Sequence, residues 1–274
     1  NFDWMSGGFL GVEVFFVISG YLITLLLIGE HERTGRIDLK SFWLRRARRL
    51  LPALFVMLAL LMIYVALFKR DRLGELLGDT FAGLGYISNW YQIWVGQGYT
   101  SGADFAPLRH LWSLAVEEQF YLFWPIAMVG MISLGRRRLP EISRWLIIIA
   151  LTIAVLIGIA YHGGLPGDDA ATWEIFGRDI SRNDFLYLST ISRATGLLLG
   201  AAFAMLWRPV AVMRGPLRNR GPLLDVFALV GVAGLGAMFY LLHVAFDTGR
   251  GDPWLFRGGF LLCAIFTIFV MAAV

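Results

Sequence analysis

Cysteine, histidine and charged residues are scarce in this sequence. One cysteine, Cys263, and four histidines occur in 274 residues, and charged residues make up 16% of the chain. A single cysteine excludes an intrachain disulfide and a thiolate metal cluster, and the histidines are dispersed along the chain. A Gly-Lys-Ser/Thr phosphate loop is also absent. The sequence therefore contains no motif for a metal or for a P-loop nucleotide.

The two ends lack the features of a complete chain. The first residues, Asn1-Phe-Asp-Trp-Met, have neither an initiator methionine nor the basic region of a signal peptide, and the sequence stops within an apolar run at Val274. We expect residues 1–274 to be a fragment truncated at both ends.

Apolar sequence is abundant. Hydrophobic residues form 58% of the chain and the mean hydropathy is +0.66, well above a soluble domain. A bilayer span needs about 20 largely apolar residues. Seven runs meet this requirement: 9–28, 51–68, 110–134, 143–162, 185–207, 222–244 and 257–274. An eighth run, 76–96, is less apolar. The sequence predicts an all-α polytopic transmembrane helix bundle that forms a single domain over residues 1–274.

Segment 76–96 is aromatic and amphipathic, and charge counting bears on whether it crosses. The net charge of +4 could suggest a nucleic-acid partner, but the basic residues flank apolar runs, as in cytoplasmic loops. Loops 29–50, 135–144 and 208–220 are basic, whereas 163–184 is mainly acidic. All four fit the positive-inside rule if 76–96 does not cross fully. We predict a re-entrant or interfacial segment there.

Polar residues gather at the mouth of the run 110–134: Arg109, His110, Glu117, Glu118 and Gln119. An unpaired charge in hydrocarbon costs about 2.5 kcal/mol or more, so such groups normally pair inside the protein or in a wet cavity. On a helix His110 and Glu117 lie close to two turns apart, and a histidine near a carboxylate suits proton removal from a hydroxyl. The alternative is a structural cluster, or side chains that snorkel to the interface.

Residues 110–125, His-Leu-Trp-Ser-Leu-Ala-Val-Glu-Glu-Gln-Phe-Tyr-Leu-Phe-Trp-Pro, resemble the signature of the membrane acyltransferase-3 family, whose members O-acylate cell-envelope sugars. Residues 7–23, 42–52 and 187–201 resemble three further family segments in the same order. The resemblance also implies an Arg and a His in a helix ahead of 7–23, the His being the family's proposed base. Neither lies in this sequence, so His110 is expected to be auxiliary or structural rather than the sole base.

The basic segment 42–52 carries Arg45, Arg48 and Arg49 on one side of a predicted helix. Guanidinium groups match phosphate oxygens, so the resemblance implies that these arginines contact the phosphates of an acyl-CoA donor. The alternative is attraction to anionic lipid head groups, which needs no ligand.

A second charge lies deep in an apolar run. Arg193 sits about two turns inside 185–207, where a carboxylate such as Glu117 or Glu118 is its expected partner. It is expected either to stabilise charge in the reaction or to hold the bundle together as a buried ion pair. Glu13 is expected to pair with Arg109 or with the missing first helix, or to lie at the interface.

The resemblance implies an O-acyltransferase of the bacterial inner membrane that moves an acyl group, most simply acetyl, from acyl-CoA to a hydroxyl of an envelope glycan or glycolipid. Its site residues would be His110, Glu117, Glu118 and Arg193, with Arg45, Arg48 and Arg49 at the donor, and no metal or bound cofactor. Two alternatives remain: a membrane carrier of an acyl group or glycolipid, and a non-catalytic subunit of an envelope complex.

Overall fold

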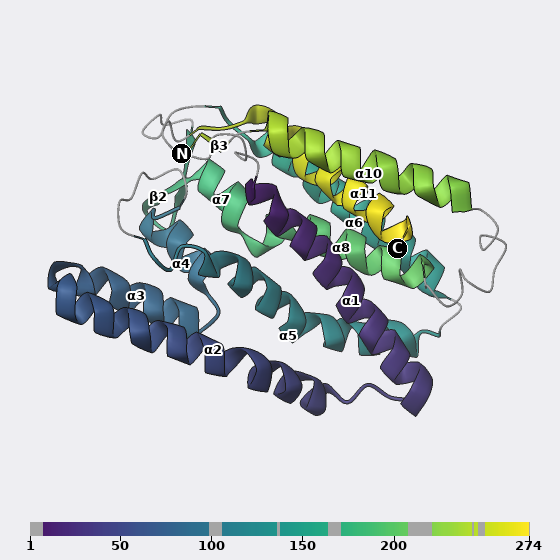
Figure 1. Ribbon diagram of the computed structural model, residues 1–274, viewed down its shortest axis with the longest axis horizontal. Coiled ribbons are helices and arrows are strands. Elements are labelled where there is room, and N and C mark those ends of the chain that lie inside the picture. Colours follow the sequence, from purple (N-terminus) through teal and green to yellow (C-terminus); the bar gives the residue numbers. More distant parts are fainter. Residues whose placement is uncertain are drawn as a thin grey trace.

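The computed structural model describes residues 8–98, 106–135, 138–163, 171–207, 221–242, 244–245 and 250–273. Its long helices form an elongated bundle (Figure 1). They are α1 (Leu10–Thr34), α2 (Leu39–Phe68), α5 (Leu111–Ser133), α6 (Leu139–Ala160), α8 (Thr190–Leu206), α10 (Gly221–Leu241) and α11 (Phe260–Ala273). The shorter elements are η2 (Arg70–Arg72), α3 (Leu73–Leu84), α4 (Ser88–Val95), α7 (Arg182–Leu188) and the π-helical turn η6 (Leu255–Gly259). Two small hairpins pair β1 (Thr172–Ile175) with β2 (Arg178–Ser181) and β3 (Val244–Ala245) with β4 (Arg250–Gly251).

The predicted all-α bundle is confirmed. Within the described ranges, six helical stretches are long and apolar enough to cross a membrane: 10–34, 39–68, 139–160, 182–206, 221–241 and 255–273. The predicted run 110–134 forms the 23-residue helix α5, which falls outside this set. The polar residues Glu117, Glu118 and Gln119 lower its hydropathy.

Helices α1 and α8 form the centre of the bundle, with α6 and α11 packed around them and α10 outside against α11. The backbones of α1 and α8 come close because glycine residues lie at their crossing. A Cβ atom on Gly20 would overlap the carbonyl of Leu197, and one on Gly200 would overlap that of Val17. Small residues at such crossings allow the backbone approach that favours helix association in membranes.

The predicted run 185–207 is broken at Ser189, whose extended backbone separates α7 from α8. A break leaves main-chain carbonyls without helical partners, and a membrane protein must satisfy them internally. Arg193 Nε donates to the carbonyl of Tyr187 at 2.6 Å, and Asn89 Nδ2 donates to that of Leu188 at 3.2 Å. The break is therefore stabilised by side chains from α8 and α4.

Segment 76–96 is not one continuous helix. Thr80 of α3 donates to the sulfur of Met62 on α2, whereas Tyr86 packs near Leu51, so α3 runs back along α2. Helix α4 then returns along α5, antiparallel to it, because Asn89 contacts Gln119 while Gln92 contacts the carbonyl of Arg109. Residues 73–95 thus form a helical hairpin, as expected of a re-entrant segment, whose tip at 85–87 contacts Gln119 in the first half of α5.

The α1–α2 connection, which was predicted to lie on the same side as the loop after α5, is at the same end of the bundle as the end of α5. His31 in the last turn of α1 and Arg36 of the α1–α2 connection line a common hollow with Ile132 and Ser133 at the end of α5. At the opposite end, Arg178 of β2 donates to the carbonyl of Trp94 at the end of α4. Much of the loop charge used in that prediction, at 136–137, 164–170 and 208–220, lies outside the described residues.

Candidate functional site

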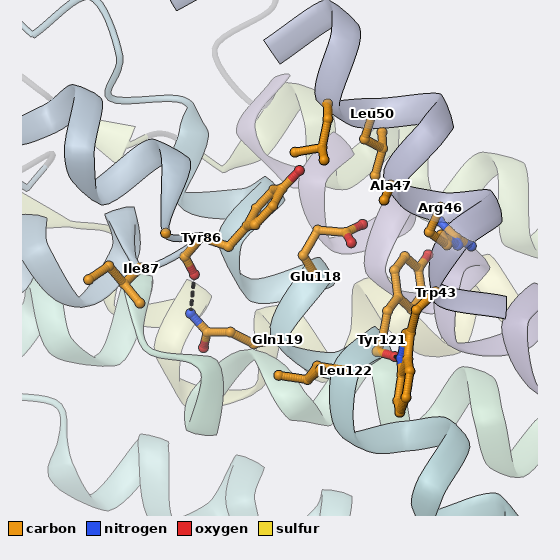
Figure 2. A pocket seen from close by; sticks show the side chains of 12 residues that line it. Trp43, Arg46, Ala47, Leu50, Tyr86, Ile87, Glu118, Gln119, Tyr121 and Leu122 are labelled. Atoms are coloured by element: carbon orange, nitrogen blue, oxygen red, sulfur yellow. Dashed lines mark hydrogen bonds between the residues drawn. The ribbon is translucent and has the colours of Figure 1, made fainter. Parts of the chain in front are cut away.

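The candidate site is a pocket of about 360 Å³ where α2, the α3–α4 tip and α5 meet (Figure 2). Its volume is at the lower end of the range of small-molecule sites. The lining comes from three segments: Trp43, Arg46, Ala47, Leu50 and Leu51 of α2; Gly85, Tyr86 and Ile87 at the tip; and Glu118, Gln119, Tyr121 and Leu122 of α5. A mostly apolar wall with a few convergent polar groups is typical of a ligand site.

The α2 wall follows from helical spacing. Arg46 and Ala47 follow Trp43 by three and four residues, and Leu50 follows them by four and three. The four residues therefore share one face, which turns toward α5. Pro52 lies within the same helix. The guanidinium carbon of Arg46 lies 3.8 Å from the centre of the Tyr121 ring, a cation–π contact. Arg46 is therefore the basic residue of this segment that reaches the pocket.

The tip of the hairpin is held by the amide of Gln119. Its Nε2 donates to the carbonyl of Tyr86 at 2.8 Å and to Oδ1 of Asn89 at 3.0 Å. Its Oε1 accepts from Trp90 Nε1 at 3.1 Å and from the hydroxyl of Thr190 on α8. One side chain thus uses both donors and both acceptor positions to tie α4, α5 and α8 together.

Glu118 is the acidic residue of the pocket, and its carboxylate points into the space between Tyr86 and Arg46 (Figure 2). The Oε1 atom is buried and has no hydrogen-bond partner among the described residues. A buried acceptor without a partner costs about 1–3 kcal/mol, so an orphan of this kind needs an explanation such as an unseen partner or a chemical role. Glu118 is therefore positioned to accept a proton or a hydrogen bond from a ligand.

Glu117, next in sequence, has a different setting. It is buried, and its Oε1 accepts a hydrogen bond from Ser19 of α1 at 2.7 Å and another from the hydroxyl of Tyr121. Because neighbouring residues on a helix are about 100° apart, Glu117 faces α1 while Glu118 faces α2. Glu117 connects α1 to the Tyr121 wall of the pocket and does not line the pocket itself.

The predicted pairing of Arg193 with Glu117 or Glu118 is wrong. Its NH1 lies 3.2 Å from Oε2 of Glu13, and both side chains are almost fully buried. The guanidinium also stacks on Phe260 at 3.8 Å and on Tyr187 at 4.4 Å. The pair joins α1 to α8, and Arg193 contributes nothing to the pocket lining. The expected pairing of Glu13 with Arg109 is also wrong, because Glu13 pairs with Arg193.

His110 is not brought to Glu117 or Glu118. It is exposed at the N-cap of α5, whereas Glu117 lies buried two turns further along. Arg45, Arg48 and Arg49 are exposed on the outer face of α2, and Arg45 lies 3.6 Å from Glu30. Arg46 was not predicted as a site residue, although its spacing from Trp43 and Leu50 placed it on the inward face of α2.

No group of three or more His, Cys, Asp or Glu side chains that could hold a metal ion occurs within the described part of the chain.

Comparison with known proteins identifies relatives along the whole sequence. The sequence model of the acyltransferase-3 family, described as an acyltransferase domain, matches residues 1–274. O-acetyltransferase OatA of Staphylococcus aureus strain COL is 36% identical over 272 residues, which cover 99% of this chain and 41% of OatA. A second protein of that strain, "Putative O-acetyltransferase SACOL0978", is 38% identical over 276 residues, covering 100% of this chain and 42% of its own length.

No solved structure matches the chain. The chain spans about two fifths of the length of these relatives. The six apolar helices in the described part of the chain, together with the family match, make it an integral membrane protein. Since the match covers every residue from 1 to 274, this chain belongs to the acyltransferase-3 family.

Proposed function

We propose that the protein is an O-acyltransferase of the bacterial inner membrane that transfers an acyl group, most simply acetyl, from acyl-CoA to a hydroxyl of a cell-envelope glycan. The observation that carries the proposal is the unpartnered, buried carboxylate oxygen of Glu118 in an otherwise mainly apolar pocket. The names of the two relatives, both O-acetyltransferases, support the same class of reaction.

The reaction needs one proton acceptor and a site for the thioester. The hydroxyl oxygen of the glycan attacks the thioester carbonyl, the carbon–sulfur bond breaks, and a carbon–oxygen ester bond forms. The hydroxyl proton passes to Glu118 and then to the departing CoA thiolate, giving free CoA and the O-acyl glycan. A positioned general base of this kind contributes typically 10²–10⁴-fold to a rate.

In this proposal the acyl-CoA donor binds along α2. The pocket is too small for a whole CoA molecule and suits its acyl-thioester end. Arg46 lies inside the pocket, whereas Arg45, Arg48 and Arg49 lie outside it on the same helix, where the CoA phosphates would extend. We assign the phosphates to these three arginines, because guanidinium groups bind phosphate oxygens bidentately.

His110 is the N-cap of α5, about two turns before Glu118. The helical rise places its Cα about 12 Å from that of Glu118 along the helix axis. Its exposed imidazole suits a contact with the incoming glycan more than proton transfer inside the pocket. Glu117 and Arg193 support the site by holding α1 against α5 and α8.

The test uses the full-length protein in membranes with acetyl-CoA labelled in the acetyl group and an envelope-sugar extract. Wild type should place label on sugar, and Glu118→Gln should lose at least a hundredfold of that rate while unfolding at the wild-type temperature. Glu75→Gln, an exposed carboxylate on α3, is the matched control and should retain full activity.

Two outcomes contradict the proposal. Label that crosses the membrane without becoming attached to sugar would identify a carrier, and unchanged transfer by Glu118→Gln would remove Glu118 from the chemistry.

A further inference from the structure

Tyr86 at the hairpin tip has an unfavourable backbone conformation. Its φ of 52° lies in the left-handed region, where Cβ crowds the backbone of any residue other than glycine. Gly85, the adjacent residue that could take this conformation freely, has a φ of −81° instead. The chain therefore places a bulky aromatic residue at the one position of the turn that favours glycine.

The structure holds Tyr86 in this conformation from two sides. Its N–H donates to the carbonyl of Gly83 at 3.1 Å, and its own carbonyl accepts from Gln119 at 2.8 Å. Gln119 is itself fixed by Asn89, Trp90 and Thr190. Strained residues of this kind persist only where the surroundings over-determine them, and they concentrate at functional sites.

The strain determines where the ring lies. The Tyr86 side chain lines the pocket, with its hydroxyl directed into it (Figure 2). The ring also packs against the apolar cluster of α2, α3 and α5 that lies beyond the pocket, formed by Leu54, Leu58, Val65, Leu76, Leu108 and Leu111. Tyr86 therefore stands between the pocket and a hydrophobic interior into which the pocket would otherwise extend.

The pocket has two distinguishable ends. At one end, Trp43 and Arg46 lie near the start of α2 and the basic α1–α2 connection. At the other end, Tyr86 of the hairpin tip lies beside Leu51, which is further along α2. If the CoA phosphates bind the basic end, as in the function proposed above, the free end of the acyl chain points at Tyr86.

We propose that Tyr86 sets the length of the acyl group that the pocket accepts, and so restricts the donor to short-chain acyl-CoA. The inference rests on the proposed donor. A ring fixed by the backbone clamp acts as a stop, because it cannot move aside for a longer chain. Removing the ring joins the pocket to the leucine cluster and provides apolar surface for additional methylene groups.

The experiment measures the affinity of purified full-length protein in nanodiscs for non-transferable thioether analogues of acetyl-, butanoyl-, hexanoyl- and octanoyl-CoA. The proteins compared are wild type, Tyr86→Phe, Tyr86→Ala and Tyr86→Gly. The phenylalanine variant keeps the ring and is the matched control, and the glycine variant also removes the backbone strain. Thermal unfolding of each variant reports on folding independently of the ligand.

Wild type and Tyr86→Phe should bind the acetyl analogue and lose affinity as the chain lengthens. Tyr86→Ala and Tyr86→Gly should instead gain roughly tenfold in affinity for each two added methylenes, as burial of apolar surface predicts. Tyr86→Gly should unfold no earlier than Tyr86→Ala, because glycine adopts the left-handed conformation without strain.

Identical chain-length profiles in wild type and Tyr86→Gly overturn the inference. A change in Tyr86→Phe equal to that in Tyr86→Gly overturns it as well, because the hydroxyl and not the ring would then be responsible. If wild type binds no acyl-CoA analogue of any length, the proposed donor fails, and this is seen before any variant is compared.

Discussion

The indole Nε1 of Trp43 donates a hydrogen bond of 3.1 Å to the main-chain carbonyl of Tyr121. This carbonyl is available because Pro125, four residues further along α5, has no N–H to donate to it. A proline in one helix thus creates the acceptor that fixes another helix beside it. The contact lies in the pocket wall, since both Trp43 and Tyr121 line it.

This relationship predicts a specific double-mutant result. Trp43→Phe should destabilise the protein by about 1–3 kcal/mol, because the partly buried carbonyl of Tyr121 loses the hydrogen bond from the indole. In a Pro125→Ala background the same change should cost measurably less, because the restored N–H can bond that carbonyl within the helix. Unfolding midpoints in one detergent give both values, and strictly additive costs would contradict this explanation.

Removal of one partner of the Arg193–Glu13 pair should lower the stability of the protein more than removal of both. Arg193→Met should cost about 3–5 kcal/mol, because it leaves the Glu13 carboxylate buried and uncompensated. Arg193→Met combined with Glu13→Met should recover much of that loss. Thermal unfolding is the measurement, with Arg48→Met as the exposed control. A double variant less stable than either single one would show that the pair is not mainly structural.

Arg46 and Arg48 provide a matched comparison on one helix. Arg46→Ala should lower the acyl-transfer rate by about ten- to a hundredfold, as loss of a hydrogen bond to a charged group predicts. Arg48→Ala should lower donor affinity by only a few-fold, because exposed charge pairs contribute about 0–1 kcal/mol. Initial rates over a range of acetyl-CoA concentrations separate the two. Equal losses would place the donor on the outer face of α2 and not in the pocket.

Two glycines predict opposite responses to alanine. Gly200→Ala should destabilise by about 1–3 kcal/mol or more, since its Cβ would overlap the Val17 carbonyl and force α1 and α8 apart. Gly29→Ala, where nothing lies within 4 Å of the added Cβ, should gain about 0.5–1 kcal/mol of helix stability. Thermal unfolding checks both, and similar shifts in the two variants would contradict the close crossing.

Asp38 predicts a pH effect at the start of α2. Its carboxylate accepts hydrogen bonds from the N–H of Ser41 at 3.0 Å and from the Ser41 hydroxyl at 2.7 Å, and these lower its pKa below the ordinary value. A lowered pKa in the folded state means that the cap stabilises the helix above the unfolded pKa of about 3.9 and is lost as the pH falls through the folded value.

Hydrogen exchange of the first-turn amides of α2, corrected for intrinsic rates, should therefore show protection falling below about pH 4. Asp38→Asn keeps a capping acceptor but does not titrate, so its protection should stay flat. A parallel decline in both proteins would assign the effect to another group.

Much of the bundle follows from local sequence. The apolar runs predict the helices because length and hydropathy are local properties. Segment 76–96 was predicted as re-entrant or interfacial from its aromatic residues and the charge of the neighbouring loops, and the structure forms the hairpin at 73–95 there. Its division at 85–87 depends on Gln119, which is distant in sequence and could not be located from the segment alone.

The partner of a buried charge is less predictable. Glu13, Glu117 and Glu118 are all acidic residues in or beside apolar runs, and the sequence does not say which of them Arg193 meets. The choice depends on how α1 crosses α8, which the contact of Gly200 with Val17 sets. Arg46 differs: helical spacing alone was enough to place it on the inward face of α2, and that signal was available in the sequence.

The hairpin of α3 and α4 also bears on how the protein assembles. Helices of 12 and 8 residues are too short to enter a bilayer as independent spans. The amides of Asn89 and Gln119 find full hydrogen bonding only when Leu188 and Thr190 are present. Thr190 is synthesised 101 residues after Asn89 and 71 residues after Gln119. The hairpin therefore reaches its final hydrogen bonding only after α8 has been translated, so the pocket is completed late in biogenesis.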